Sequence, residues 1–476
     1  MSGDKKGLTT LNLVMLSLGT VVGGSFFLGS AVAIRAAGPA IIVAFIIGGL
    51  LMYFILTALS EMTVANPSTG SFRDYAEINF GPLLGFVVGW VYWTGLALGM
   101  SSEATAVSIF LREWLPGVPL GVIAAAIVVV VTVLNLVGAS LFSRLEGSLA
   151  GVKLLALFGF LAIGIFLIAG LLPGRPVLGA GALMGEAFAP RGLAGIAGSM
   201  LIVMFSYAGF EVVGLAAPEA RDHHRTVVRA VFYTVVVLVG LYLGVMFVLL
   251  PLIPTASLGP DASPLVAALN VHGLGAAARI FNVVMITAIL STMLASTFGL
   301  GRMIYALALK GHAPAWLKKM HSSQVPLKGI LFSGLGMLAG VSLSFVLPKQ
   351  VYLFLVASGG YSTLFAYAVI MITHYRYRRA NGCPPIGQCQ LPGFPYTSLI
   401  TLVAIVAIIA SMPLIPGQGA GLAAGLLLTV FYIAAFYIYR FRVPARSLRF
   451  RGMSAKPVAG GRDDDRSRDE DNWKKE

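Results

Sequence analysis

The chain has 476 residues, of which 58% are hydrophobic and only 11% are charged, and its mean hydropathy is +0.88. This composition lies far outside the soluble range and excludes an ordinary water-soluble protein. The formal net charge of +14 does not indicate a nucleic-acid partner, because the basic residues follow membrane topology, as described below.

Apolar runs of about 20 residues repeat along the whole chain, which is the length that crosses a bilayer as an α-helix. Backbone groups in lipid must be satisfied within the segment, so we expect an all-α polytopic membrane protein. Twelve membrane-spanning helices are predicted, at residues 11–34, 39–60, 82–111, 120–140, 149–172, 194–216, 228–254, 276–309, 326–347, 350–375, 395–414 and 418–440.

The placement of lysine and arginine predicts the orientation of these spans. With the N-terminus in the cytoplasm, 26 of the 33 basic residues fall on or near the inner side, six fall on or near the outer side, and Lys153 alone is expected deep within the membrane. This is the positive-inside pattern, so both termini are expected in the cytoplasm and the protein in the cell (inner or plasma) membrane. The first span is too long and too rich in glycine for a cleaved signal peptide. Residues 441–476 mix both charges without apolar periodicity and are predicted to be a disordered cytoplasmic tail.

Cys383 and Cys389, in the motif CPPIGQC, fall in a predicted cytoplasmic loop. A reducing compartment disfavours a structural disulfide there, so we expect two unpaired thiols. With no histidine nearby, the pair is also a poor zinc site, and no metal or other cofactor is predicted.

The first span contains LGTVVGGSFFLGS (18–30), with Gly19, Gly23, Gly24 and Gly29 inside a helix. Glycine destabilises a helix interior by roughly 0.5–1 kcal/mol relative to alanine, so the segment is expected to break near its middle. Small residues also permit close helix packing, and Gly19 with Gly23 forms a GxxxG pair, which is the alternative interpretation.

A second segment of this kind lies five spans further on, in MLIVMFSYAGFEVVGLAAPEA (200–220). Ser206, Ala208 and Gly209 lie near its middle, and Glu211 follows two residues later. Broken segments at matching places in oppositely oriented halves are typical of inverted-repeat transporters. We therefore predict one transporter domain over residues 1–440. Its first repeat covers 1–172, its second covers 194–375, and two further helices lie within 395–440.

Several motifs resemble the bacterial amino-acid permeases of the amino acid–polyamine–organocation superfamily. They are VGGSFFLGS (22–30), ALSEMTVANPSTGSFRDYA (58–76), GFVVGWVYWTGLALGMSSEATA (85–106), FSYAGFEVVGLAAPEA (205–220) and RMIYALALKGHAPAWL (302–317). Ser25 departs from the pattern, because it stands where the family has a third glycine. In span 8, Leu294, Ala295 and Ser296 replace a common Asn-Ser-Gly triplet, so no substrate contact is carried over from that triplet.

The resemblance implies two inverted five-helix repeats with broken helices 1 and 6, two further helices, and an amino acid bound between spans 1, 3, 6, 8 and 10. Free amides where the first helix resumes suit a carboxylate, and exposed carbonyls suit an ammonium group. The predicted substrate-binding residues are Val22, Gly23, Gly24, Ser25, Glu103, Ser206, Tyr207, Ala208 and Gly209.

Ionisable groups within spans are costly, so each one suggests a function. In some relatives the counterpart of Lys153 stands in for a sodium ion between spans 1, 5 and 8. A buried lysine also loses affinity for its proton, so Lys153 is predicted to act in proton coupling or as an ion mimic. A fixed structural cation and a snorkelling side chain are the alternatives. Glu103 is predicted to carry a proton or to contact the substrate ammonium, or else to bridge helices as a neutral acid. Glu211 is expected to link the second break to neighbouring helices, in a structural or gating role rather than in direct contact with the substrate. Phe210 and Tyr207 are candidate gates, with ordinary packing as the alternative.

Together these observations predict a secondary active transporter that imports neutral amino acids with protons by alternating access. The sequence contains no Walker P-loop and no plausible set of catalytic residues, so neither an ATP-driven pump nor an enzyme is expected. The alternatives are an exchanger or exporter without proton coupling, and a non-transporting sensor or channel. The sequence carries no signal for the oligomeric state.

Overall fold

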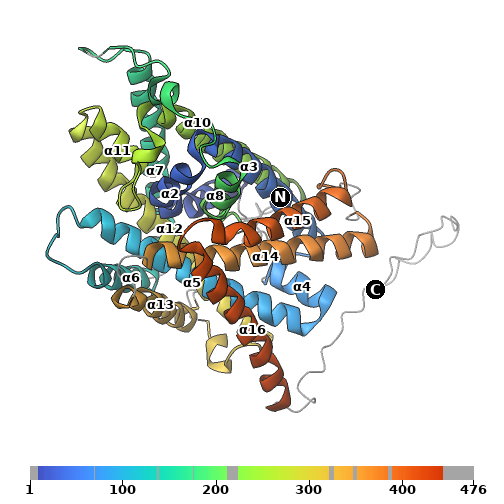
Figure 1. The fold of residues 1–476 in the computed structure, drawn as a ribbon. Coiled ribbons are helices and arrows are strands. Elements are labelled where there is room, and N and C mark those ends of the chain that lie inside the picture. Colours follow the sequence, from blue (N-terminus) through green and yellow to red (C-terminus); the bar gives the residue numbers. More distant parts are fainter. Residues whose placement is uncertain are drawn as a thin grey trace, which may run out of the picture. The chain divides into compact units, whose positions relative to one another are not determined.

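A computed structural model of the chain describes residues 9–68, 70–136, 139–174, 176–211, 223–320, 326–346, 351–383 and 389–442. These residues form helices and connecting turns and contain no strand (Figure 1). The chain divides into a compact unit, Met1–Phe436, and a second unit, Tyr437–Glu476. Most of the predicted tail, residues 443–476, lies outside the described residues.

The all-α polytopic architecture is confirmed. Within the described residues, nine helices are long and apolar enough to cross a membrane, and three apolar helices are shorter. The exact number of twelve spans and the division into two repeats remain predictions. The helices that coincide with the predicted spans are α1 (Thr10–Val21), α2 (Ser30–Ala37), α3 (Ile41–Ala65), α5 (Pro82–Leu111), α6 (Leu120–Leu136), α7 (Ala139–Ile168), α8 (Gly192–Ser206), α10 (Val228–Leu252), α12 (Gly275–Leu309), α13 (Leu327–Ser342), α14 (Val351–Asn381), α15 (Tyr396–Ser411) and α16 (Gln418–Arg442).

Some helices extend well beyond the apolar runs that predicted them. The α7 helix begins ten residues before the expected start at residue 149, and α14 ends six residues after residue 375. Hydropathy reports the part of a helix that lies in lipid, whereas hydrogen bonding continues into the interface. Two short helices complete the described set, α4 (Phe72–Phe80) and α11 (Pro264–Val271).

The first predicted break is present. The α1 helix ends at Val21, and Val22 is extended, with φ −73° and ψ 97°. The chain then resumes as a π-helical turn, Ser25–Gly29, which continues into α2. A π-turn between two helices is a common feature of functional sites.

The second predicted break begins where α8 ends, at Ser206. Residues 207–211 form turns, and Gly209 has φ +107°, a conformation that side-chain-bearing residues rarely adopt. A Cβ atom on Gly209 would also lie 2.7 Å from the carbonyl oxygen of Thr20. Glycine is therefore required on both grounds. Residues 212–222, which follow, lie outside the described residues.

Within the compact unit, α5 packs against α14, α12, α4, α13 and α6, and Figure 1 shows it among them. Small residues bring the backbones of α5 and α14 together: a Cβ atom on Gly359 would lie 3.0 Å from the oxygen of Gly95. Close approach through small residues is the usual way in which membrane helices associate. This packing holds the third predicted span, and with it Glu103, in the middle of the unit.

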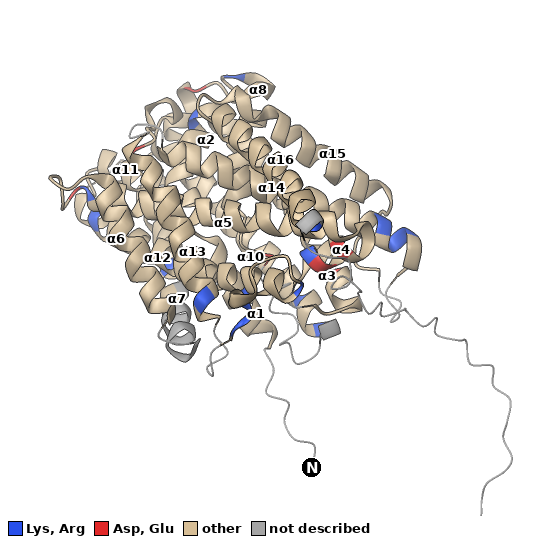
Figure 2. Cartoon of the chain, turned by 90° about the horizontal axis from the view of Figure 1, so that it is seen from below, with Lys and Arg blue, Asp and Glu red and all other residues tan. Residues whose placement is uncertain are grey.

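Most lysine and arginine residues lie away from the central parts of the helices. Figure 2 shows them mainly near helix ends and in connections; Lys153 on α7 and, among the acids, Glu103 on α5 are buried exceptions. Such a distribution is expected when the middle of the helix lies in lipid.

The expectation for the two cysteines is wrong. Cys383 and Cys389 form a disulfide, with their Cα atoms 5.1 Å apart, which is an ordinary separation for a bridged pair. The two residues meet because the chain turns back after α14: Arg378 Nη1 donates a hydrogen bond to the oxygen of Leu391 at 2.8 Å. The expectation of unpaired thiols is based on the reducing cytoplasm, which does not indicate how close the backbone brings the two cysteines.

Candidate functional site

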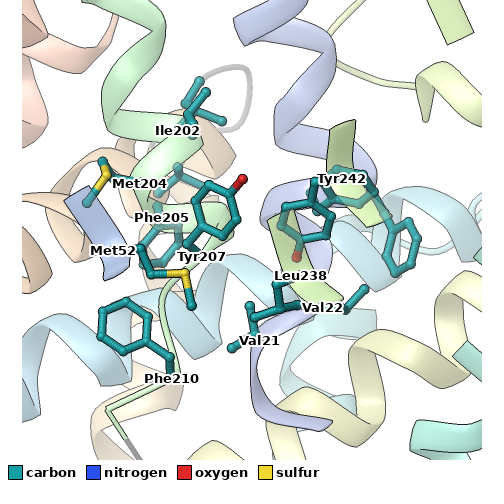
Figure 3. Close-up of a cluster of buried hydrophobic side chains, with 14 of the residues drawn as sticks. Val21, Val22, Met52, Ile202, Met204, Phe205, Tyr207, Phe210, Leu238 and Tyr242 are labelled. Carbon is teal, nitrogen blue, oxygen red and sulfur yellow. The ribbon is translucent and has the colours of Figure 1, made fainter. Parts of the chain in front are cut away.

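The two broken segments lie side by side. Thr20 Oγ1 donates a hydrogen bond to the oxygen of Gly209 at 3.0 Å, and Ser25 Oγ lies 3.4 Å from the oxygen of Phe205. The structure thus brings together the predicted binding residues of both segments, and Figure 3 shows Val21 and Val22 near Phe205 and Tyr207. Most of these residues are buried; Ala208 and Gly209 are half-buried.

The carboxylate of Glu103 occupies the predicted carboxylate-binding amides. Gly24 N donates to Oε2 at 2.5 Å, and Ser25 N lies 3.4 Å from Oε1. A Cβ atom would lie 3.0 Å from Oε2 if placed on Gly23 and 2.8 Å from it if placed on Gly24. The paired glycines are therefore required for this approach. The amides at the helix break bind a carboxylate in this structure, and that carboxylate belongs to the protein.

Lys153 satisfies the carbonyl groups that the first break exposes. Its Nζ atom donates to the oxygen of Gly19 at 2.7 Å, to the oxygen of Val22 at 3.2 Å and to Thr292 Oγ1 at 3.1 Å. The side chain is fully buried. Lys153 lies on α7, the fifth predicted span. Its partners lie on the first span, at Gly19 and Val22, and on α12, the eighth span, at Thr292. These are the three spans that the family resemblance names.

Thr292 is a site residue that sequence reasoning missed. Its hydroxyl accepts from Lys153 and lies 2.9 Å from the oxygen of Val22, to which it can donate. The positions of this span at which the chain departs from the family pattern, residues 294–296, lie two to four positions further along. The same helix also holds Thr287, Ser291, Ser296 and Thr297, so nothing in the sequence singles out Thr292.

Two tyrosines bind further backbone carbonyls at the breaks. Tyr242 OH on α10 donates to the oxygen of Ser206 at 3.0 Å, and its ring stacks on Phe26 with centroids 4.0 Å apart. Tyr352 OH on α14 donates to the oxygen of Gly24 at 3.1 Å. Neither tyrosine was predicted, although a tyrosine among aliphatic residues in a span usually needs a hydrogen-bond partner.

Glu211 connects the second break to two neighbouring helices. Its carboxylate accepts from Tyr92 OH on α5 at 2.7 Å and from Tyr367 OH on α14 at 3.1 Å. Gly209 N donates to the same carboxylate at 3.0 Å. The side chain is 1% exposed, so these donors replace water around it. This geometry matches the linking role that the sequence analysis expected.

The two candidate gate residues are both fully buried. Phe210 stacks on Tyr367 with ring centroids 5.1 Å apart. Tyr207 donates to the oxygen of Phe45 at 3.2 Å, and its ring lies 5.1 Å from that of Tyr242 (Figure 3). These contacts anchor both rings against other helices.

A further polar cluster joins α4 to the segment after α12. Arg73 on α4 pairs with Asp74 at 2.7 Å and with Glu77 at 2.5 Å, and its Nη2 lies 2.8 Å from His312 Nδ1. Burial lowers the pKa of His312 to about 3, and the positive charges of Arg73 and Lys310 add to the shift. His312 therefore acts as a neutral acceptor for the guanidinium group.

The two broken segments together expose backbone groups of both kinds, donors and acceptors. They place amide donors beside carbonyl acceptors at the same depth, which is the complement of a zwitterion. Here every such group that we have described is bound by a side chain of the protein: Glu103 binds the amides, and Lys153, Tyr242 and Tyr352 bind the carbonyls. A ligand at this place must exchange with them.

Comparison with known proteins identifies the family. The family model described as amino acid permease matches residues 12–448. The chain is 32% identical over 439 residues to the amino acid permease YtnA of Bacillus subtilis, covering 91% of this chain and 94% of that protein. It is 31% identical over 444 residues to the gamma-aminobutyric acid permease of the same organism, covering 93% and 95%. It is 31% identical over 422 residues to the L-asparagine permease of Streptomyces coelicolor, covering 86% and 85%.

The stretch matched by the family model includes both broken segments, Glu103 and Lys153. The chain belongs to the amino acid permease family and is a multi-pass membrane transporter of amino acids.

Proposed function

We propose that this permease imports neutral amino acids together with protons, and that the carboxylates of Glu103 and of the substrate alternate on the same backbone amides. The observation that carries the proposal is the hydrogen bond of 2.5 Å from Gly24 N to Glu103 Oε2. An internal carboxylate already binds where a substrate carboxylate is expected.

Two carboxylates cannot share these amides, because their negative charges repel at short range. A protonated carboxyl group is uncharged and is a weaker acceptor than a carboxylate. Protonation of Glu103 would therefore weaken its hold on Gly24 and Ser25 and would remove the repulsion. The substrate would bind when Glu103 takes up a proton and would be displaced when Glu103 loses it.

In this scheme Lys153 supplies a resident positive charge. Its ammonium group binds Gly19 O, Val22 O and Thr292 Oγ1, a set of oxygen ligands of the kind that a sodium ion takes. With this place filled by a side chain, transport is expected to be independent of sodium. One zwitterion and one proton would then move together, so each cycle would carry one positive charge inward.

The charges at the site favour substrates with no net charge. The carboxylate oxygens of Glu211 are taken by two tyrosine hydroxyls and by Gly209 N, and those of Glu103 face backbone amides. A cationic side chain on the substrate would need a further acid. The names of the relatives agree, because gamma-aminobutyric acid and L-asparagine are both neutral zwitterions overall near pH 7.

The proposed conformational change is a rocking motion, with both termini in the cytoplasm. Spans 1, 2, 6 and 7 would move against spans 3, 4, 8 and 9 around the site. Glu211 lies across this division, since it joins the second break to Tyr92 on the third span. Exchange or export without proton coupling, and a sensor or channel, are the competing functions.

The test is uptake of a panel of labelled amino acids by purified protein in liposomes, with and without an inward proton gradient and with sodium or potassium as the salt cation. We expect accumulation of a neutral amino acid that requires the gradient, is abolished by a protonophore and is equal in the two salts. Counterflow with no response to the gradient would indicate an exchanger. Steady conductance would indicate a channel. Uptake of no amino acid by any route would overturn the proposal.

A further inference from the structure

An apolar groove of about 410 Å³ lies between the end of α14 and the short helix α4. Ile372 and Ala380 of α14 and Phe80 of α4 supply its apolar lining. Two arginines of α14, Arg376 and Arg379, also border it. The groove is remote in the sequence from the broken segments and takes no part in the proposed transport mechanism.

The three arginines near the end of α14 serve two different purposes. Arg378 is directed into the protein, where Nη1 lies 3.5 Å from Glu61 Oε2 and donates to the oxygen of Leu391. Arg376 and Arg379 are exposed, and neither forms an ion pair within the described part of the chain. The structure therefore leaves two guanidinium groups at the edge of the groove whose charge is not neutralised by a carboxylate of the described chain.

Each guanidinium group contacts an aromatic residue, Arg376 through a ring face and Arg379 through a tyrosine hydroxyl. The guanidinium carbon of Arg376 lies 4.8 Å from the centroid of the Phe80 ring, a cation–π contact that ties α14 to α4. Arg379 Nη1 lies 3.4 Å from Tyr375 OH. These contacts restrain the two cations on one side of the apolar lining.

Exposed apolar side chains place this region at a membrane interface. Ile78 on α4 is 66% exposed and Ile372 on α14 is 38% exposed, and α14 is long and apolar enough to cross a membrane. Exposed isoleucine beside exposed arginine is unfavourable in water alone. It is favourable where hydrocarbon and headgroups meet.

We propose that this groove binds an anionic phospholipid, with an acyl chain along Phe80 and Ile372 and the phosphate between Arg376 and Arg379. The apolar lining is complementary to a hydrocarbon chain, and the two cations are complementary to a negative headgroup. Phosphatidylglycerol has both parts. A bound lipid would bridge α4 and α14 and would stabilise their packing.

The test uses the full-length protein in detergent, titrated with phosphatidylglycerol or with phosphatidylcholine of the same chains. The readouts are the melting temperature and the number of lipids retained in native mass spectrometry. We expect phosphatidylglycerol, and not phosphatidylcholine, to raise the melting temperature. In R376Q/R379Q the phosphatidylglycerol concentration for half of this effect should rise ~30-fold, from the loss of two cations near the headgroup.

Three controls test whether the effect depends on positive charge, on this place on the protein and on the acyl chains of the lipid. R376K/R379K keeps both charges and should retain most of the effect. K318Q/K319Q removes two exposed lysines at the end of a different segment, Ala315–Lys318 and its following residue, and should behave as the wild type. Glycerol 1-phosphate, which lacks acyl chains, should give no protection. Equal phosphatidylglycerol dependence in R376Q/R379Q and the wild type, or an equal loss in K318Q/K319Q, would overturn the proposal. Equal protection by glycerol 1-phosphate would show a soluble-anion site and would overturn the lipid assignment.

Discussion

The carboxylate of Glu103 lies within hydrogen-bonding distance of the backbone nitrogen of Gly24, 79 residues away in the sequence. The contact joins the third span to the break in the first. In the proposed mechanism, Glu103 is an internal competitor for the place that a substrate carboxylate would take.

Glu103→Gln is expected to uncouple transport from the proton gradient. Glutamine is close to glutamate in shape and can still accept from Gly24 N, but it cannot exchange a proton in the physiological range, so displacement by substrate no longer depends on pH. Gradient-driven accumulation in liposomes should fall at least ~10-fold, whereas counterflow at equal pH should persist with a flat pH profile. Glu113→Gln, which removes an acid just after the same helix, is the matched control and should accumulate substrate as the wild type does. A Glu103→Gln protein with the wild-type pH profile would contradict the competition mechanism.

The contact between Arg73 and His312 predicts a pH-dependent stability that is separate from transport. Burial lowers the pKa of His312 to about 3, from 6.5. Between pH 3 and pH 6.5, His312 therefore binds a proton in the unfolded chain but not in the folded chain. Stability is therefore fully present above pH 6.5 and is lost as the pH falls from there toward 3. At pH 5 the loss is about 2 kcal/mol of unfolding free energy.

His312→Asn should remove this dependence, because the asparagine oxygen can accept from Arg73 without titrating. The measurement is the melting temperature in detergent between pH 5 and pH 8. The wild type should lose more stability than the variant between pH 7 and pH 5, and the two curves should run parallel above pH 7. Parallel curves over the whole range would show that His312 does not contribute.

The positions of the two breaks could be predicted from sequence for a local reason. Gly23 and Gly24 weaken a helix wherever they occur in it, and Gly209 permits a positive φ that other residues resist. The spans themselves follow from hydropathy, since lipid imposes a minimum apolar length. The place of Lys153 beside Gly19 and Val22 was implied only by the family resemblance, because nothing local to α7 specifies its partners.

The contacts that sequence reasoning missed depend on which face of a helix points inward. Spans that are apolar all round carry no amphipathic stripe, so their rotation cannot be read from periodicity. Thr292, Tyr242 and Tyr352 were missed for this reason. Glu103 was identified as a buried acid, but its position on the amides of Gly24 and Ser25 follows from the way α5 packs, which is a long-range property.

Lys153→Met should abolish transport and destabilise the fold. Methionine has a similar length but no donor, so the oxygen of Gly19 would lose its donor at 2.7 Å, whereas the oxygen of Val22 would keep the Thr292 hydroxyl. The cost is about 1–3 kcal/mol for a buried group left unpaired. We expect a lower melting temperature and no uptake at any pH. Lys5→Met, near the N-terminus, is a charge-matched control that should match the wild type. Uptake by Lys153→Met at the wild-type rate would exclude a role for this ammonium group.

Gly24→Ala tests the close approach itself. Gly24 has an ordinary helical conformation, with φ −63° and ψ −28°, so alanine meets no backbone strain there. Its Cβ atom would lie 2.8 Å from Glu103 Oε2 and 3.1 Å from the Cβ atom of Ala106. The added methyl group must therefore push the carboxylate away from the amides, and it would obstruct a substrate carboxylate in the same way. We expect KM to rise at least ~10-fold, in keeping with a charge-assisted hydrogen bond worth about 1.5–3 kcal/mol.

Gly240→Ala on α10, where a Cβ atom meets nothing within 4 Å, adds the same methyl group without a clash and should leave KM unchanged. An unchanged KM in Gly24→Ala would mean that the substrate carboxylate binds elsewhere, and the amides at this break would then serve Glu103 alone.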